Sequence, residues 1–261
     1  MHLSAINLYP IKSLRGIPLT SARLDDFGLA GDRRWMVADP TGRFVSQREE
    51  HRLALVHVAV DGKELVVGAA GEPDLRVGVP AADTPTEPVT IWADECLAQD
   101  GGSEAARWFS RYLDTPVRLM YMPDTTVRIA NPDFVPEPRR VSFADAYPLL
   151  LIGEASLADL NRRMEQPLPM NRFRPNLVVA GSEPFAEDGW KTIQVGSIVM
   201  DIVKPCDRCV TTTIDQETGI AGKDPLRTLA QFRKWSGQVY FGQNVVHRSP
   251  GTLTQGDPVS T

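Results

Sequence analysis

Two cysteines spaced three residues apart are the sharpest chemical feature of the sequence. Cys206 and Cys209 lie between an apolar run and a β-branched run, residues 210–214. A zinc site needs four ligands, commonly two such pairs, but Cys96 is the one further cysteine and the four histidines show no ligand spacing. A thioredoxin-type pair opens a helix, whereas β-forming residues follow Cys209. A buried structural pair is the third interpretation, and spacing alone leaves all three open.

Two cations flank this cysteine pair. Lys204 precedes it and Arg208 lies within it. Adjacent cations lower the pKa of a thiol and favour the thiolate, and a thiolate is a soft ligand for a transition metal. The segment therefore predicts a thiolate that could bind such a metal.

Further cations occur in short motifs at the edges of apolar runs, where strand ends meet loops. If these ends converge in the fold, they form a pocket for an anion, because Arg binds phosphate through two parallel hydrogen bonds and Lys adds a point charge. The alternative is that each is an ordinary solvated surface cation. The motifs are Pro10-Ile11-Lys12-Ser13, Gly31-Asp32-Arg33-Arg34-Trp35, Pro138-Arg139-Arg140 and Asn171-Arg172-Phe173-Arg174-Pro175-Asn176.

Composition limits the classes of function. The 261 residues are 42% hydrophobic and 23% charged, which is typical of a globular chain rather than a disordered one. A net charge of −5 predicts no nucleic-acid partner. No apolar stretch approaches the length of a membrane span, and the N-terminus lacks a secretory signal. Three cysteines without an export signal predict a reducing compartment. Phosphate-binding loops, dinucleotide fingerprints and nucleophile elbows are missing from the sequence.

Many short strands must position these residues, since 21 prolines and 20 glycines separate short apolar runs. We predict a β-rich α+β fold with a β-barrel-like core, peripheral helices and two packed subdomains. We predict that all five tryptophans lie in the core. The proline-containing segment 124–140 is predicted to form a long loop or a connection between domains. The main predicted strands are residues 2–8, 177–180, 210–214 and 239–246, and hairpin turns are predicted at 61–62 and 196–197. The predicted helices are 103–113, 154–164 and 226–235. Ser103 is the predicted N-cap of the first helix.

Taken together and in order, several motifs resemble the two-part MOSC proteins, and most closely the amidoxime-reducing components and their bacterial relatives. The resemblance covers nearly the whole chain. It implies a MOSC N-terminal β-barrel-like domain over residues 1–120 and a MOSC domain over 121–261. The matching segments are Tyr9 to Ser13 with Gly16, Asp32 to Val37, Glu154 to Asn161, Asn171 to Asn176, Ala186 to Asp188, Cys206 to Thr213 and Phe241 to Gln243.

The resemblance also implies a molybdenum cofactor, a pterin with a dithiolene and a terminal phosphate. One protein thiolate holds the metal in this family, and by position in the motif it is Cys209, which is also the catalytic residue, with Cys206 only a neighbour. Two positions depart from the mammalian pattern: Tyr147 replaces a small hydroxyl residue and Asn244 replaces a tyrosine. The cofactor-binding residues that the resemblance implies are Lys12, Ser13, Arg33, Tyr147, Arg174, Asn176, Asp207, Arg208, Cys209 and Asn244.

Similar proteins reduce N-hydroxylated compounds such as amidoximes and hydroxylamines with two electrons and two protons. If Cys209 binds the metal, two thiols are left, which is too few for the four that an iron–sulfur cluster usually needs. The sequence also has no nicotinamide fingerprint. We therefore expect a separate electron donor, a ferredoxin- or cytochrome b5-like protein with its reductase. Because the membrane anchor of mammalian relatives is missing, we expect a soluble cytoplasmic protein. Two alternatives remain: a cofactor- or sulfur-handling MOSC module without reductase activity, and a β-rich domain with structural cysteines and no cofactor.

Overall fold

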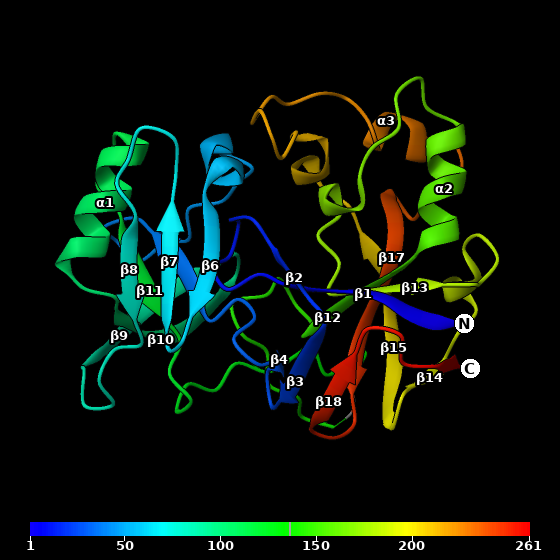
Figure 1. Cartoon of the computed structure of the whole chain (residues 1–261), viewed down its shortest axis with the longest axis horizontal. Coiled ribbons are helices and arrows are strands. Elements are labelled where there is room, and N and C mark those ends of the chain that lie inside the picture. The colour runs from blue at the N-terminus through cyan, green and yellow to red at the C-terminus, as the bar shows by residue number, and fades with distance from the viewer. Residues whose placement is uncertain (136) are drawn as a thin grey trace.

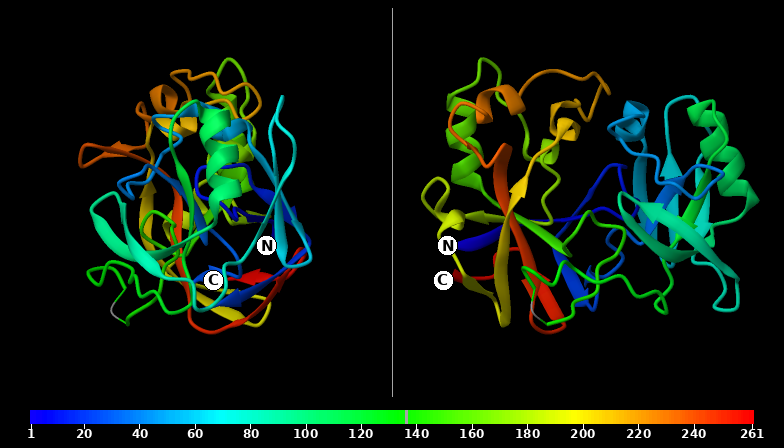
Figure 2. Two further views of the ribbon diagram at one scale, coloured as in Figure 1. Left: turned by 90° about the vertical axis from the view of Figure 1, so that its left-hand side faces the viewer. Right: turned by 180° about the vertical axis from the view of Figure 1, so that it is seen from behind.

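The computed structural model describes residues 1–135 and 137–261. Two lobes lie side by side in Figure 1, one built from β5 to β11 with α1 and the other from the second half of the chain with β1 and β2. The chain ends meet at the outer edge of the second lobe, where the Val259 amide donates to the Met1 carbonyl (Figure 2). The strand-rich architecture confirms the predicted β-rich α+β class.

The first lobe contains two antiparallel sheets and one long helix. One sheet has the order β5-β11-β10-β9 and the other β6-β7-β8. Helix α1 packs its apolar face, including Trp108 and Phe109, against the core between them. The elements are β5 (Trp35–Ala38), β6 (His57–Asp61), β7 (Glu64–Gly68), β8 (Leu75–Gly78), β9 (Thr86–Ile91), β10 (Asp94–Asp100), α1 (Ser103–Leu113), β11 (Arg118–Tyr121) and the 3-10 helix η1 (His51–Leu55).

The second lobe is built on a nine-stranded sheet of order β19-β14-β15-β17-β12-β13-β1-β2, with β16 paired to β17. Its strands are antiparallel except for the β12–β13 pair. Strand β1 pairs with β13, so the chain begins in the sheet that its second half completes. The strands are β1 (His2–Leu8), β2 (Ile17–Leu19), β12 (Leu149–Gly153), β13 (Leu177–Ala180), β14 (Thr192–Val195), β15 (Ile198–Asp207), β16 (Lys234–Trp235), β17 (Gln238–His247) and β19 (Val259–Ser260).

A small sheet and short helices complete the fold. Strand β3 lies between β18 and β4 in the small sheet. Phe173 and Phe241 pack beneath α2 and α3 at a ring-centroid distance of 4.4 Å. These elements are β3 (Ser21–Asp25), β4 (Gly28–Leu29), β18 (Gly251–Thr254), α2 (Glu154–Arg162), α3 (Leu226–Leu229) and the 3-10 helices η2 (Met170–Arg172), η3 (Ala186–Asp188) and η4 (Val210–Thr213).

Most predicted elements are present, including β1, β13, β17, α1, most of α2 and both hairpins. The predicted Ser103 cap is wrong, because Gly102 occupies the N-cap position of α1. The predicted helix 226–235 ends at Leu229, and the chain then forms the β16–β17 hairpin. The loop 124–140 contains no helix or strand in its described residues, and Pro136 lies outside them.

The predicted strand 210–214 is also wrong, because the segment after Cys209 forms the 3-10 helix η4. The hydroxyls of Thr212 and Thr213 donate to the carbonyls of Cys209 and Val210 at 2.9 and 2.7 Å. Threonine side chains thus bond to the backbone three residues earlier, which offers the chain an alternative to sheet pairing. β-branched residues alone therefore did not decide this segment. No described helix is long and apolar enough to cross a membrane.

Candidate functional site

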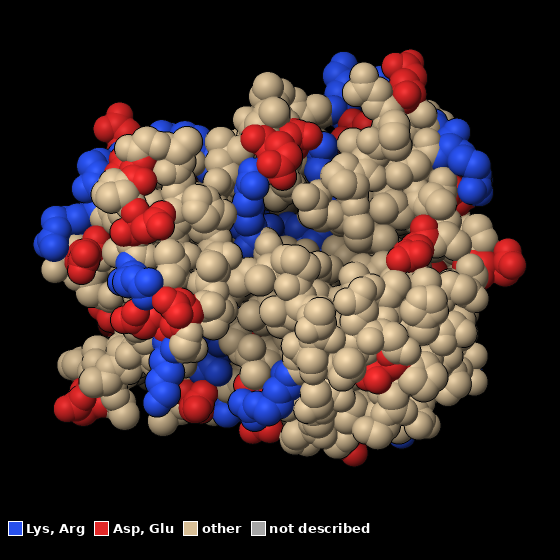
Figure 3. Space-filling model, viewed as in Figure 1, with Lys and Arg blue, Asp and Glu red and all other residues tan. Residues whose placement is uncertain are grey.

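A cavity of about 510 Å³ lies between the two lobes. Lys and Arg side chains gather in the recess there (Figure 3). Its lining contains six basic and two acidic residues, although the whole chain carries a net charge of −5. All the predicted site residues line this cavity: Lys12, Ser13, Arg33, Tyr147, Arg174, Asn176, Asp207, Arg208, Cys209 and Asn244. The prediction that the dispersed cations converge is confirmed for the motifs of Lys12, Arg33 and Arg174, but it is wrong for the fourth motif, because Arg139 and Arg140 are not among the lining residues.

Cys209 lies at the turn between β15 and η4, as the N-cap residue of η4. It is half-buried, and its Sγ lies 3.4 Å from Thr211 Oγ1. The hydroxyl of Thr212 in η4 donates to the Cys209 carbonyl and so helps to fix the backbone that carries this thiol. The thiol is therefore held at the cavity wall by its own local structure.

Cys206 lies near the end of β15, where the pairing with β17 is irregular around Pro205. Proline cannot donate a ladder hydrogen bond, so such a position suits a bulge. Arg208 donates from Nη1 to Cys206 Sγ at 3.0 Å and from Nη2 to the Phe173 carbonyl at 2.7 Å. Burial nevertheless raises the pKa of the Cys206 thiol, and Arg208 opposes this only in part.

These contacts correct the expectation that both flanking cations favour a thiolate. Arg208 contacts the sulfur of Cys206, whose pKa is raised rather than lowered. Lys204 pairs with Asp207 at 3.3 Å. The two cations that flank the cysteine pair in sequence thus have partners other than Cys209. The positive charge of the cavity also comes from motifs that are distant in sequence.

Arg33 and Asn176 form a rigid polar cluster around a fully buried carboxylate. Asp32 accepts from Arg33 Nη1 at 2.5 Å, from Asn176 Nδ2 at 3.1 Å and from the Tyr9 amide at 2.8 Å. Burial lowers the pKa of Arg33, but Asp32 outweighs this and the net pKa is raised. Arg33 also donates to Asn176 Oδ1 and to the Arg174 carbonyl. This cluster joins the segments after β4 and before β13.

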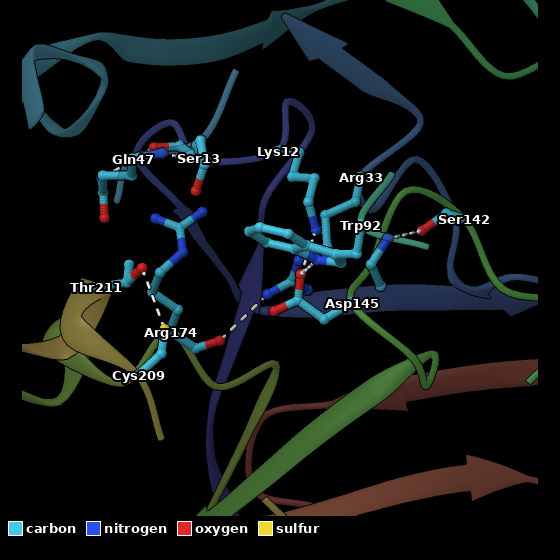
Figure 4. A network of polar contacts seen from close by, with 12 residues as sticks. Lys12, Ser13, Arg33, Gln47, Trp92, Ser142, Asp145, Arg174, Cys209 and Thr211 are labelled. Atoms are coloured by element: carbon cyan, nitrogen blue, oxygen red, sulfur yellow. Dashed lines mark hydrogen bonds and ion pairs between the residues drawn. The ribbon is translucent and has the colours of Figure 1, made fainter. Parts of the chain in front are cut away.

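Arg174 is held differently from the other cations. Its guanidinium lies over the Tyr9 ring at 4.4 Å and points toward Ser13 (Figure 4). Within the described part of the chain it has no side-chain hydrogen bond or ion pair. Burial lowers its pKa to about 10. An unpaired, partly buried cation that lines a cavity is the feature expected of an anion-binding site.

Lys12 lies across the cavity in a small cluster with Asp145 and Trp92 (Figure 4). Its Nζ is 2.5 Å from Asp145 Oδ1, which also accepts from Trp92 Nε1 at 2.9 Å. Burial lowers the pKa of Lys12 to about 8, although Asp145 acts against this. Burial would raise the pKa of Asp145, but Lys12 and Trp92 hold it below its ordinary value.

The remaining predicted residues complete the walls. The Ser13 hydroxyl oxygen accepts from the backbone N–H of Gln47 at 3.1 Å. Asn244 lies on β17 beside Lys204 of β15. Tyr147 precedes β12, and burial raises the pKa of its hydroxyl.

Backbone strain is concentrated at this cavity. Seven described non-glycine residues have positive φ, and four of them line it. Three of the four were predicted from sequence: Ser13 at 71°, Arg33 at 47° and Arg174 at 56°; the fourth is Trp92 at 54°. Left-handed backbone costs non-glycine residues energy and clusters where function requires a particular geometry. The positive-φ residues and the clustered cations therefore identify the same site.

The sequence interpretation missed several lining residues, among them Phe44, Arg48, Trp92 and Asp145. Arg48 follows the apolar run at Phe44 and could have been found by the rule that identified the other cations. Trp92 and Trp235 were assigned to the core, but the structure shows them 43% and 41% exposed, so the prediction is wrong for these two. The presence of a tryptophan in the sequence does not indicate whether it lies in the core or at the tip of a hairpin.

A closed protein-only metal site finds no support in the described residues. No group of three or more His, Cys, Asp or Glu side chains there could hold a metal ion. The zinc interpretation therefore lacks a ligand set in the part of the chain that is described. Cys209 offers one sulfur ligand in a cavity whose other groups suit an anion.

Comparisons with known proteins match both halves of the chain. Residues 1–116 match the MOSC N-terminal beta barrel domain and residues 138–260 the MOSC domain. Mitochondrial amidoxime-reducing component 1 from Homo sapiens is 33% identical, over 97% of this chain and 80% of that protein. Mitochondrial amidoxime reducing component 2 from Rattus norvegicus is 34% identical, over 98% and 82%. The solved YUAD protein from Bacillus subtilis aligns over 98% of this chain and 92% of that chain, with a TM-score of 0.46 and 11% identity.

Proposed function

The chain belongs to the MOSC family that includes the amidoxime-reducing components, and from this premise we propose that it is a molybdenum-cofactor-dependent reductase of N-hydroxylated compounds. An amidoxime would take up two electrons and two protons to give an amidine and water. The observation that carries the proposal is the convergence of Cys209 with six cations in a single cavity, among them the unpaired Arg174.

The residues present fit an anionic pterin cofactor. Arg174 keeps an unpaired guanidinium at the cavity despite a pKa lowered to about 10, which is a cost that a bound anion would offset. Cys209 supplies one soft sulfur ligand. A single sulfur suits a molybdenum cofactor better than it suits a closed zinc site, which needs four ligands. The net positive lining suits a phosphate-bearing group, which the acidic chain as a whole would repel.

Each residue then has a separate role. Cys209 Sγ would hold the metal, which supplies two-electron redox chemistry when it is bound. Arg33 presents a guanidinium fixed by Asp32, and Arg174 adds a second one; the two lie 4.5 and 4.4 Å from the centre of the Tyr9 ring. Lys12 Nζ keeps its proton at neutral pH, because its pKa of about 8 lies above 7. The remaining contacts to the cofactor would come from Ser13, Tyr147, Asn176, Asp207, Arg208 and Asn244.

Electrons would come from a separate protein. The chain has three cysteines, and Cys209 is committed to the metal in this proposal. Cys96 is buried in the first lobe, where burial raises the pKa of its thiol to about 11. We propose a small ferredoxin- or cytochrome b5-like donor with its own reductase as the partner.

The test uses the full chain produced in a host that makes the cofactor. Molybdenum content is measured, and benzamidine is quantified after incubation with benzamidoxime and dithionite-reduced methyl viologen. We expect Cys209→Ala to lose most of the metal and all turnover, because it removes the sulfur ligand. Cys206→Ala is the matched control and should retain both.

Two outcomes would contradict the proposal. If Cys206→Ala lost metal while Cys209→Ala kept it, the ligand assignment would be wrong. Molybdenum-loaded protein that forms no benzamidine above the Cys209→Ala background would favour the cofactor- or sulfur-handling alternative.

A further inference from the structure

Trp92 occupies an unusual backbone position beside the cavity. Ile91 of β9 pairs with Asp94 of β10, so Trp92 and Ala93 form a two-residue hairpin turn. The φ of Trp92 is +54°. Two-residue hairpin turns with positive φ normally take Gly, Asn or Asp, and a bulky residue there is an outlier. The turn therefore carries a strain that glycine would avoid.

Burial does not compensate for this strain. Trp92 is 43% exposed, in contrast to the buried Trp35 and Trp108. Its contacts are polar in part: Nε1 donates to Asp145 at 2.9 Å, the ring meets Phe44 edge-on at 5.4 Å, and Lys12 Nζ lies 5.9 Å from the ring centre. A strained and exposed aromatic residue at a cavity indicates a role in function rather than in packing.

The guanidinium of Arg48 lies 4.1 Å from the Trp92 ring. Arg48 is exposed, and among the described residues its side chain has no hydrogen bond or ion pair. Both side chains line the cavity. The pair thus presents a partly exposed π surface in the lining of the cavity that also contains Cys209, on the first-lobe side.

We propose that Trp92, backed by Arg48, is a specificity-determining residue that favours N-hydroxylated substrates with a planar aromatic group over aliphatic ones with the same N–O group. The inference rests on the proposed function and names its substrate class. A planar ring gains offset or edge-on stacking with the indole, whereas a methyl group in the same place gains almost nothing.

The experiment compares benzamidoxime with acetamidoxime, which share the reacting group and differ in the ring. Trp92→Gly removes the indole and suits the left-handed backbone. Trp92→Phe keeps a ring and loses the bond to Asp145. Trp235→Ala is the matched control, because Trp235 is 41% exposed but stacks on Tyr240 in the β16–β17 hairpin, outside the described cavity lining.

For Trp92→Gly we expect kcat/KM for benzamidoxime to fall about three- to tenfold, mainly through KM, with less than a twofold change for acetamidoxime. Trp92→Phe should keep most of the aromatic preference, and Trp235→Ala all of it. An equal loss for both substrates in Trp92→Gly would overturn the inference, because it would show a structural role. Loss of preference in Trp92→Phe would overturn it as well, because the bond to Asp145 would then be the cause.

A binding measurement separates this inference from the proposed function. The dissociation constants of the two amidoximes for the full chain are measured by calorimetry, without turnover. If the wild-type protein reduced neither compound, the proposed function would fail. Tighter binding of benzamidoxime by wild type, lost in Trp92→Gly, would still support the inference, and equal binding of both compounds by wild type would overturn it.

Discussion

Arg172 and Arg174 stand two residues apart in one motif, and we predict that their removal changes stability in opposite directions. Burial lowers the pKa of Arg174 from its ordinary value of 12.5 to about 10. At about 1.4 kcal/mol per tenfold change in proton affinity, this corresponds to roughly 3 kcal/mol of destabilisation of the folded state. The penalty is present in full at neutral pH, where Arg174 is charged both folded and unfolded. It fades as the pH rises above about 10.

Arg174→Gln should therefore stabilise the cofactor-free protein. Loss of the contact with Tyr9, worth about 1 kcal/mol or more, offsets part of the gain. We expect a net increase of about 1–2 kcal/mol in the free energy of unfolding, or a rise of about 2–8 °C in Tm. Calorimetry or thermal unfolding followed by circular dichroism measures the change.

Arg172→Gln is the control with the opposite sign, because burial lowers the pKa of Arg172 too, but its guanidinium has hydrogen-bond partners that Arg174 lacks. Arg172 is 5% exposed and donates to the carbonyls of Thr212 and Thr213 at 3.1 and 2.8 Å, and to Asp215 at 3.1 Å. The Thr213 carbonyl keeps the Gly222 amide as a donor, but the Thr212 carbonyl loses its partner, which costs about 1–3 kcal/mol. We expect Tm to fall by several degrees, because the support of η4 is lost.

Inorganic phosphate adds a second measurement on the same variants. At 100 times its Kd, a ligand stabilises the folded state by about 2.7 kcal/mol. A tenfold weaker affinity in Arg174→Gln would lower this by about 1.4 kcal/mol, while Arg172→Gln should keep the full increment. A lower Tm for Arg174→Gln than for wild type, or equal stabilisation of both by phosphate, would refute the reasoning.

Three further predictions concern single positions. Because the Lys12 pKa is about 8, phosphate affinity measured by calorimetry should fall between pH 7 and pH 9 as its charge is lost, and Lys12→Arg should remove this step. Trp92→Gly should unfold about 2–4 °C above Trp92→Ala, the reverse of the usual order, since only glycine accepts a φ of +54° without strain; equal Tm values would show that the turn is unstrained. Gly242→Ala should cost about 2 kcal/mol or more in urea unfolding, because a Cβ would lie 2.6 Å from Ile152 Cγ1 and 2.9 Å from the Leu151 carbonyl at a φ of +81°.

The sequence predicted the members of the site better than their contacts. Cations at the ends of apolar runs indicated Lys12, Arg33 and Arg174, and the family resemblance supplied Tyr147 and Asn244, which no local pattern marked. All of them line one cavity. The pattern could not tell paired from unpaired cations, because the pairing of Lys12 and Arg172 depends on Asp145 and Asp215, which come from other segments of the chain.

The errors in the fold have a common cause. Residues 210–214 have the composition of a strand, but hydroxyl bonds to the Cys209 and Val210 carbonyls turn them into a 3-10 helix. Trp92 is of a residue type that usually lies in the core, but its position at the tip of a hairpin exposes it. In both cases local geometry, which composition does not encode, outweighed intrinsic preference.

The energetic costs of this fold are concentrated where the lobes meet. The largest apolar clusters lie within the lobes, one around Trp108 and Phe109 and another along β1, β12 and β13. Between them lie an unpaired guanidinium at Arg174 and left-handed backbone at four residues that line the cavity. Stability supplied by the two cores lets the chain keep these unfavourable features. An anion in the cavity would offset the cost of the unpaired charge and contact both lobes at once, so ligand binding should stabilise the protein at the boundary between the lobes.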